Sequence, residues 1–469
     1  MADVAPCLVA LTRLRMDELA NAWVADECTP FQIALLGVFD ATPFLLADGA
    51  LDLPRIRREL AVRARRVAGL GRRVVWTRLG EGRPVWAPDP AFDPDRHIGT
   101  VTLPPGSDLP DWAANRIVRP LPLDRPLWRA EVIDGLPGQR FAVIIVVHHV
   151  AADGMAGVAL AGSLLDPSAD GAQQSAPLPA APPLPSSRDL LRDRRDRAVA
   201  ALRRARPPST ATVHRLRDLA GQVRDASSDL RTRTSVTSLP RRVGPDRRLA
   251  VVRHPLDELR RTGHTLGVTV NDLLLAAVAG GLRDLLRSRG DDVDSMRLRT
   301  SVPAATGAGG QASGILLVDL PVAERDPLRR LALVNAMTTT AKRRLYAGAP
   351  DISDVLHLPV PLARLGMVWM RRFGGTRVNL FVTDVPGPPT PLWLAGARLL
   401  EAVPVAPLVQ HVGLGVAALS YAGDFAVSVQ ADGTVSGLDL FADGMARSFD
   451  AFRKAAADGA RLQAVGTVA

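Results

Sequence analysis

A run of seven apolar residues that ends in two histidines constrains this chain more than any other segment. Phe141–Val147 is apolar and rich in β-branched side chains, which predicts a strand buried on both faces. His148 and His149 follow directly, and Asp153–Leu165 has the apolar spacing of a helix. The order of buried strand, polar turn and helix predicts two imidazoles held by the scaffold where the strand ends.

The length of the chain predicts more than one domain. It has 469 residues, which exceeds a usual single domain. The proline-rich segment Pro177–Ser187 reads as an extended linker, and charged helices are predicted over Arg188–Arg206 and Val213–Leu230. We therefore divide the chain into an N-terminal domain over residues 1–165, a connector over 166–245 and a C-terminal domain over 246–469.

Both halves mix strand-like and helix-like segments, which indicates an α/β fold. In the second half, Thr269 and Asp272 have the spacing of a capping box at the start of a helix. Strands are predicted over Ile315–Leu320, Val378–Val382 and Phe425–Gln430, and a final amphipathic helix over Leu438–Lys454.

Composition and charge exclude several classes of protein. There are 58 Lys+Arg against 48 Asp+Glu, a net charge of +10, with arginine supplying nearly all the positive charge. This excess suits an anionic partner, although solvated helix faces explain the arginine clusters more simply. No nucleic-acid-binding motif is present, and two cysteines cannot make a disulfide framework.

No secretory signal or membrane-spanning segment is legible, so we expect a cytoplasmic location. Contact with a membrane surface or a lipid droplet stays open. The segment Leu358–Phe373 is apolar with terminal arginines. Such a segment suits either a helix in a membrane interface or a buried helix of the C-terminal domain.

The histidine pair carries two interpretations. An imidazole at a strand end can act as a general base near neutral pH and take a proton from a hydroxyl. Asp153 would then hold the loop, and Gly154 would permit close backbone approach. In the alternative, both histidines are satisfied core residues and Asp153 merely caps the next helix. A metal site is disfavoured, because adjacent residues of a strand point to opposite faces.

The segment His148–Gly154 resembles the H-H-x-x-x-D-G motif of the CoA-dependent acyltransferase superfamily. Further blocks narrow the resemblance to the bacterial wax ester synthase/diacylglycerol acyltransferase family. They cover nearly the whole chain in order and comprise F-D-P-D-R-H-I at Phe92–Ile98, P-L-W at Pro126–Trp128, V-T-V-N-D at Val268–Asp272, V-D-L-P-V at Val318–Val322, D-V-P-G-P at Asp384–Pro388 and L-S-Y-A-G at Leu419–Gly423.

This resemblance implies two chloramphenicol-acetyltransferase-like α/β sandwich domains with mixed sheets and a tunnel between them. By the same resemblance His149 is the general base, while His148 supports it and Asp153 is structural, usually paired to an arginine. Gly154, Asn271 and Asp272 are implied to lie at the substrate site, although Asn271 and Asp272 equally suit a helix start. The implied substrates are acyl-CoA and an alcohol or diacylglycerol, with no cofactor and no metal.

One departure from the family's motif affects specificity. The usual S-N-V-P-G reads T-D-V-P-G at Thr383–Gly387, which places an aspartate where a neutral amide is common. An acyl-CoA-dependent O-acyltransferase is therefore the first hypothesis. The second is a condensation-type enzyme that acylates a secondary-metabolite hydroxyl or amine, with an acyl-carrier protein as an alternative donor. The third is a non-catalytic relative that binds an acyl ligand. Chain length, acceptor and oligomeric state are not legible in the sequence.

Overall fold

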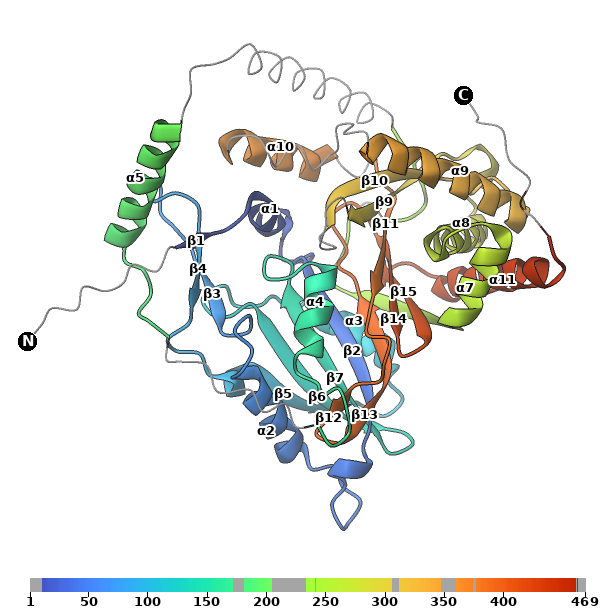
Figure 1. Cartoon of the computed structure of the whole chain (residues 1–469). Coiled ribbons are helices and arrows are strands. Elements are labelled where there is room, and N and C mark those ends of the chain that lie inside the picture. The colour runs from blue at the N-terminus through green and yellow to red at the C-terminus, as the bar shows by residue number, and fades with distance from the viewer. Residues whose placement is uncertain are drawn as a thin grey trace, which may run out of the picture.

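Two six-stranded mixed sheets form the framework of the chain (Figure 1). The computed structural model describes residues 11–171, 181–204, 233–240, 242–305, 312–346, 360–373, 377–460 and 462. The helix predicted over Val213–Leu230 lies outside these residues. The predicted strands and helices that fall within them are present, with ends that differ by a few residues.

The N-terminal sheet has the order β12-β13-β2-β7-β6-β5. Its strands are β2 (Gln32–Asp40), β5 (Ile98–Thr102), β6 (Trp128–Leu136), β7 (Arg140–His148), β12 (Trp393–Leu394) and β13 (Ala397–Val405). Helices α2 (Leu53–Ala64) and α4 (Gly154–Gly162) cover one face, and α3 (Leu109–Ile117) covers the other.

Strand β7 is buried on both faces, as its unbroken apolar run predicts. Phe141, Val143, Ile145 and Val147 pack in the cluster beneath α2 and α4, while the residues between them pack beneath α3. Its neighbours β2 and β6 run antiparallel to it, with His148 opposite Gln32. The histidine pair therefore follows the most deeply buried strand of this sheet.

The C-terminal sheet has the order β10-β9-β11-β14-β15-β8. Its strands are β8 (Arg247–Pro255), β9 (Leu298–Ala305), β10 (Ala312–Leu320), β11 (Leu380–Pro386), β14 (Leu414–Tyr421) and β15 (Asp424–Asp432). The helices beside it are α7 (Leu256–Leu266), α8 (Val270–Ser288), α9 (Pro327–Tyr346) and α11 (Leu438–Ala457).

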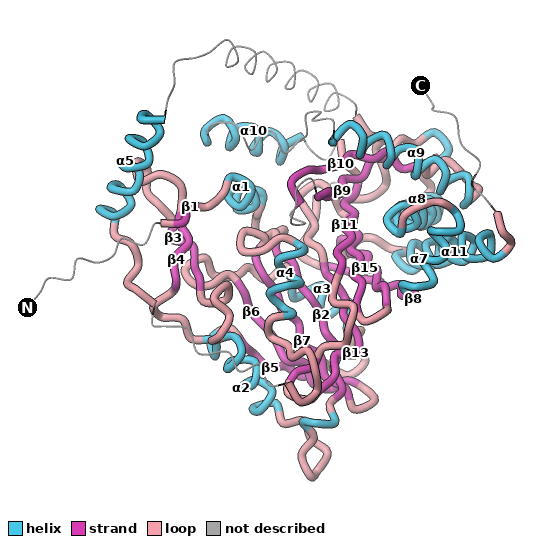
Figure 2. The backbone as a smooth tube through the Cα atoms, viewed as in Figure 1, coloured by secondary structure: helices cyan, strands magenta, loops and turns pink. Residues whose placement is uncertain are grey.

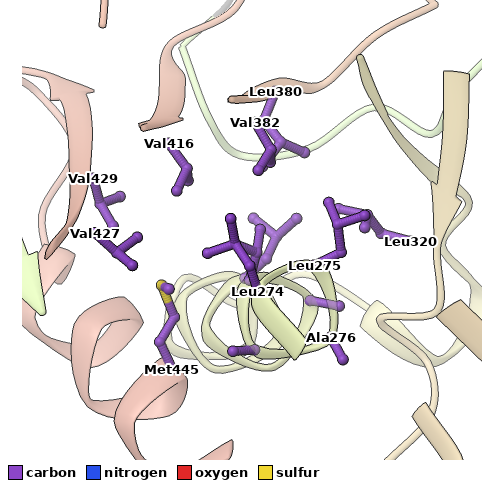
Figure 3. Packing of buried hydrophobic residues seen from close by; sticks show 14 of the residues in the cluster. Leu274, Leu275, Ala276, Leu320, Leu380, Val382, Val416, Val427, Val429 and Met445 are labelled. Carbon is purple, nitrogen blue, oxygen red and sulfur yellow. The ribbon is translucent and has the colours of Figure 1, made fainter. Parts of the chain in front are cut away.

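Helix α8 is the centre of the C-terminal core. Figure 3 shows Leu274 and Leu275 of this helix facing Val382 and Val416 of the sheet, with Met445 of α11 beside them. The predicted capping box at its start is present, because the Thr269 side chain accepts the Asp272 N–H and the Asp272 carboxylate accepts the Thr269 N–H. This buried apolar helix forms where the sequence pattern places it.

The remaining described elements lie at the periphery (Figure 2). They are the small sheet of β1 (Thr12–Arg13), β4 (Val85–Pro88) and β3 (Arg72–Val75), helices α1 (Met16–Val24), α5 (Ser187–Arg204) and α10 (Val360–Phe373), and short 3-10 turns at Thr42–Phe44, Pro94–Arg96 and Val293–Ser295. Within the described residues, no single helix is long and apolar enough to span a membrane.

The two lobes are not built from two contiguous halves of the chain. Residues 393–405, placed in the C-terminal domain by sequence, cross over and pair with β2 of the N-terminal sheet. A buried ion pair anchors the crossover, because Asp166 contacts Arg63 at 2.7 Å and accepts the Ala395 N–H at 3.1 Å. On the other side, the side chain of Asn115 in α3 exchanges two hydrogen bonds with the Arg247 backbone of β8.

Candidate active site

The site begins where β7 ends. The His148 N–H donates to the Leu127 carbonyl and the His149 N–H donates to the Phe31 carbonyl, both at 3.0 Å. The chain then turns, and the Asp153 carboxylate accepts the Ala156 N–H at 2.8 Å as the N-cap of α4. A buried strand and a capped helix thus fix the two ends of the histidine segment.

The His149 imidazole is held on one side and free on the other. It stacks on the Phe31 ring, with centroids 4.8 Å apart and an interplanar angle of 16°. Its Nδ1 lies 3.2 Å from the side-chain amide of Asn21 in α1. Among the described residues its Nε2 has no hydrogen-bond partner, and the residue is half-buried. This nitrogen is available to an incoming substrate.

Burial controls the charge of His149. It lowers the pKa of the imidazole, against the smaller opposing effects of the residue's own carbonyl and of the Asp153 and Asp17 charges. The ring is therefore neutral near pH 7, and a neutral imidazole has the lone pair that a general base needs.

His148 has a different environment. Its side chain is buried, and Nδ1 accepts the Val150 N–H at 3.1 Å. Burial, with the neighbouring His149 charge, lowers the pKa of His148 to about 4. A neutral ring that accepts a backbone hydrogen bond stabilises the turn, which agrees with the supporting role implied for it.

Asp153 and Gly154 fasten the turn to its surroundings. Within the part of the chain that the structure describes, Asp153 makes no ion pair, although its charge contributes to raising the pKa of Arg15. A Cβ added to Gly154 would lie 3.1 Å from Val385 Cγ2 of β11. The close approach predicted for Gly154 is therefore an approach of the two lobes.

Asn271 and Asp272 are adjacent in the chain but differ in burial and in hydrogen bonding. Asp272 is buried, and its carboxylate accepts hydrogen bonds from the Thr269 N–H and the Thr338 hydroxyl. This geometry agrees with the helix-start interpretation for Asp272. The Asn271 side chain is half-exposed in the first turn of α8, and no hydrogen bond to another described residue restrains it. Its contact with substrate stays a prediction.

Trp128 is a packing residue. It is buried, stacks on His97 at 4.7 Å between centroids, and donates its indole N–H to the Leu70 carbonyl at 2.8 Å. Trp128 of the P-L-W block therefore supports the N-terminal core.

Asp384 is a carboxylate without a counter-ion. It lies on β11 beside Val385, which packs against Gly154, and its side chain reaches solvent. Among the described residues it has no ion pair and no side-chain hydrogen bond. Surrounding protein nevertheless desolvates it and raises its pKa to about 6.

Replacing Asp384 with asparagine is expected to stabilise the protein above about pH 6. The raised pKa means that the folded state disfavours the carboxylate, so the native protein loses stability as the pH rises from about 4 to about 6. Melting temperatures measured from pH 3.5 to 8 should coincide for wild type and Asp384→Asn at the acid end, with the variant higher at neutral pH. Equal melting temperatures throughout would contradict this desolvation.

Helix α10 lies in the segment predicted to be either a helix in a membrane interface or a buried helix of the C-terminal domain. It packs against α1 and buries Ala363 and Met367, while Val360, Leu365 and Val368 are exposed. It is therefore neither wholly buried nor confined to the C-terminal sheet. Contact of its exposed apolar side chains with a membrane stays a prediction.

Many arginines of the predicted clusters form intramolecular ion pairs. Arg57, Arg65 and Arg73 each face an aspartate of the N-terminal lobe. This favours the simpler interpretation of the positive charge. Among the described residues, no group of three or more His, Cys, Asp or Glu side chains is placed to hold a metal ion.

Sequence reasoning missed the contacts that Asn21, Phe31 and Val385 make with the histidine segment. Asn21 and Phe31 lie more than a hundred residues before His149, and Val385 more than two hundred after it. Their spacing carries no periodic signal, although a positive φ of 51° at Phe31 marks a local constraint that only the structure reveals.

Known proteins resemble this chain in sequence and in fold. Residues 23–274 match the family model described as the wax ester synthase/diacylglycerol acyltransferase catalytic domain, and residues 309–453 match the WS/DGAT C-terminal domain. A probable diacyglycerol O-acyltransferase of Mycobacterium tuberculosis, tgs1, is 30% identical over 414 residues, which cover 82% of this chain and 86% of that protein.

Solved structures agree on the fold. A wax ester synthase/diacylglycerol acyltransferase from Marinobacter aquaeolei VT8 aligns with a TM-score of 0.69 at 20% identity, over 95% of this chain and 100% of that one. The trichothecene 15-O-acetyltransferase of Fusarium sporotrichioides aligns with a TM-score of 0.62 at 10% identity, over 97% and 100%. The first condensation domain of the calcium-dependent antibiotic synthetase, in complex with a substrate analogue, reaches 0.59 at 19% identity, over 96% and 97%.

The two-lobed α/β fold with an accessible histidine at a strand end, together with these relatives, defines an acyltransferase. Its family follows from the catalytic-domain match, which spans more than half of the chain. The chain belongs to the wax ester synthase/diacylglycerol acyltransferase family.

Proposed function

We propose that this chain transfers an acyl group from acyl-CoA to the hydroxyl of an alcohol or diacylglycerol, with His149 as the general base. The observation that carries the proposal is the half-buried imidazole of His149, which Asn21 and Phe31 hold while its Nε2 has no hydrogen-bond partner among the described residues. A fixed base with one free nitrogen suits removal of a proton from an incoming hydroxyl.

The proposed reaction is a direct transfer from the thioester to the acceptor and forms no covalent acyl-enzyme. His149 Nε2 takes the hydroxyl proton while the acceptor oxygen forms a bond to the thioester carbonyl carbon. The tetrahedral intermediate then collapses, its carbon–sulfur bond breaks, and the imidazolium returns the proton to the leaving CoA sulfur. The products are an ester and free CoA, so the proposed chemistry requires no cofactor.

Asp384 favours a second candidate acceptor, one that carries an amine. Its carboxylate reaches solvent, lies beside the residue that packs against Gly154, and has no described counter-ion. An ionised carboxylate in crowded surroundings gains from a cationic ligand. We propose that an acceptor with a protonated amine at a distance from its reacting hydroxyl would bind here better than a neutral one.

A panel of acceptors tests both candidates. Purified protein is supplied with long-chain acyl-CoA and either a fatty alcohol, a diacylglycerol or an amino alcohol matched in length to the fatty alcohol, and products are identified by mass spectrometry. Ester formation from any of the three supports the O-acyltransferase. Acyl-CoA binding without transfer to any acceptor would contradict it and favour a binding protein. An acyl-carrier donor forms a parallel arm, and exclusive use of it would favour the condensation-type enzyme.

Asp384→Asn is the matched variant for the amine-bearing acceptor. If the second candidate is right, wild type prefers the amino alcohol and the variant loses that preference, while its rate with the neutral alcohol is unchanged or higher. An unchanged ratio of kcat/KM values between the two acceptors would contradict the amine-bearing candidate and leave the first candidate intact.

A further inference from the structure

Asn21 contacts the histidine segment from a helix far away in sequence. Its side-chain amide nitrogen donates to the His149 backbone carbonyl at 3.1 Å and lies 3.2 Å from His149 Nδ1. The residue is half-buried on α1, which also packs against α10. One side chain therefore holds both the backbone and the ring of the proposed base.

The backbone carbonyl settles the orientation of the Asn21 amide. A carbonyl oxygen accepts hydrogen bonds, so the nitrogen of the amide rather than its oxygen must face it. The same nitrogen lies 3.2 Å from His149 Nδ1, so one amide group contacts both the backbone and the ring of His149.

Phe31 closes the other side of the ring. Its φ of 51° is unfavourable for a side chain with a Cβ, and this conformation aims the Phe31 carbonyl at the His149 N–H at 3.0 Å. Its ring also stacks on the imidazole. Backbone strain of this kind persists only where surrounding contacts enforce it, and here those contacts meet at the proposed base.

We infer that Asn21 is the positioning residue of the catalytic base, which fixes the orientation of His149 through contacts with its backbone carbonyl and its ring. This inference rests on the proposed function of His149. Asn21 acts through His149 and contacts no reacting atom. Its neutrality also matters, because the charged groups that act on the ring are already Asp17 of α1 and Asp153 at the N-cap of α4, and His148 is adjacent in the chain.

Two substitutions at Asn21 separate positioning from structural support. Asn21→Ala removes the donor, and kcat is expected to fall about 10- to 100-fold with KM nearly unchanged, because the base loses its geometry. Asn21→Asp places a carboxylate against the ring, which raises the pKa of His149. Catalysis requires the neutral ring, so the acid limb of the kcat/KM profile should move to higher pH by about one unit or more.

Asn115 provides the matched control. It too is an asparagine that bridges distant elements, but it joins α3 to β8, and its side chain contacts the Arg247 backbone and the Asp111 carbonyl. Asn115→Ala is expected to lower the melting temperature and to leave the acid limb where wild type has it. A purely structural Asn21 would behave in the same way as this control.

NMR of the histidine side chains measures the pKa of His149 directly and therefore tests the inference without an activity assay. With ¹³C-labelled histidine, and with His149→Gln used to assign the resonance, the pKa of His149 should rise in Asn21→Asp and not in Asn115→Ala. An unchanged His149 pKa and an unmoved acid limb in a folded Asn21→Asp would overturn the inference while wild-type acyl transfer persists. Loss of acyl transfer in wild type itself would overturn the proposed function instead.

Discussion

Replacing His149 with glutamine is expected to lower kcat for ester formation by about 10²- to 10⁴-fold, which is the usual contribution of a general base. Glutamine is close to histidine in size and has hydrogen-bonding groups, but it cannot take up a proton at neutral pH. KM for acyl-CoA should change little, because the substitution removes a proton acceptor and leaves the backbone hydrogen bonds of residue 149 with Asn21 and Phe31 in place.

His264 is the matched control for this substitution, because it is an exposed histidine near the end of α7. His264→Gln should retain wild-type kcat. Circular dichroism and melting curves check that His149→Gln is folded. A folded His149→Gln with undiminished ester formation would exclude His149 as the base.

Replacing Asp166 with alanine is expected to cause the largest loss of stability, about 3 kcal/mol, which is the low end for breaking a buried ion pair. Asp166 and Arg63 are both buried and lie 2.7 Å apart. Glu59 also contacts Arg63 and would still pair with it in the variant, so we expect a loss of stability at the low end of the range for buried ion pairs. The substitution also leaves the Ala395 N–H of the crossover without its acceptor. Urea denaturation followed by circular dichroism measures the change.

An exposed pair gives the comparison for Asp166. Asp124 and Arg125 are adjacent and largely solvated, so Asp124→Ala should change the free energy of unfolding by less than about 1 kcal/mol. Asp166→Asn should fall between the two, because its amide oxygen can still accept from Ala395. If Asp166→Ala unfolds at the same urea concentration as Asp124→Ala, the buried pair does not anchor the crossover.

Local sequence patterns predicted the elements whose formation depends on neighbouring residues. The strand before His148 could be predicted because both faces of β7 are buried, which requires an unbroken apolar run. The start of α8 could be predicted because Thr269 and Asp272, three residues apart, cap the helix with their side chains. In contrast, the pairing of β13 with β2 joins residues more than 350 apart, and no local preference specifies such a partner.

The same distinction applies to the site. His148, His149, Asp153 and Gly154 form one contiguous motif, so the sequence could place them together. Asn21 and Phe31 reach His149 only because α1 and the start of β2 fold against the end of β7. Asp272 shows that a motif can suggest two roles. The sequence suggested substrate binding or helix capping, and in the structure its carboxylate accepts hydrogen bonds from Thr269 and Thr338.

The pH dependence of kcat/KM, compared between wild type and the residual activity of His149→Gln, tests the central claim most directly. In wild type the rate should fall on the acid side with a midpoint below 6.5, because burial lowers the pKa of His149 and the neutral ring is the active form. That acid limb should be absent from the residual activity of the variant. The same limb at the same pH in His149→Gln would contradict the account, because the titrating base would then be another group.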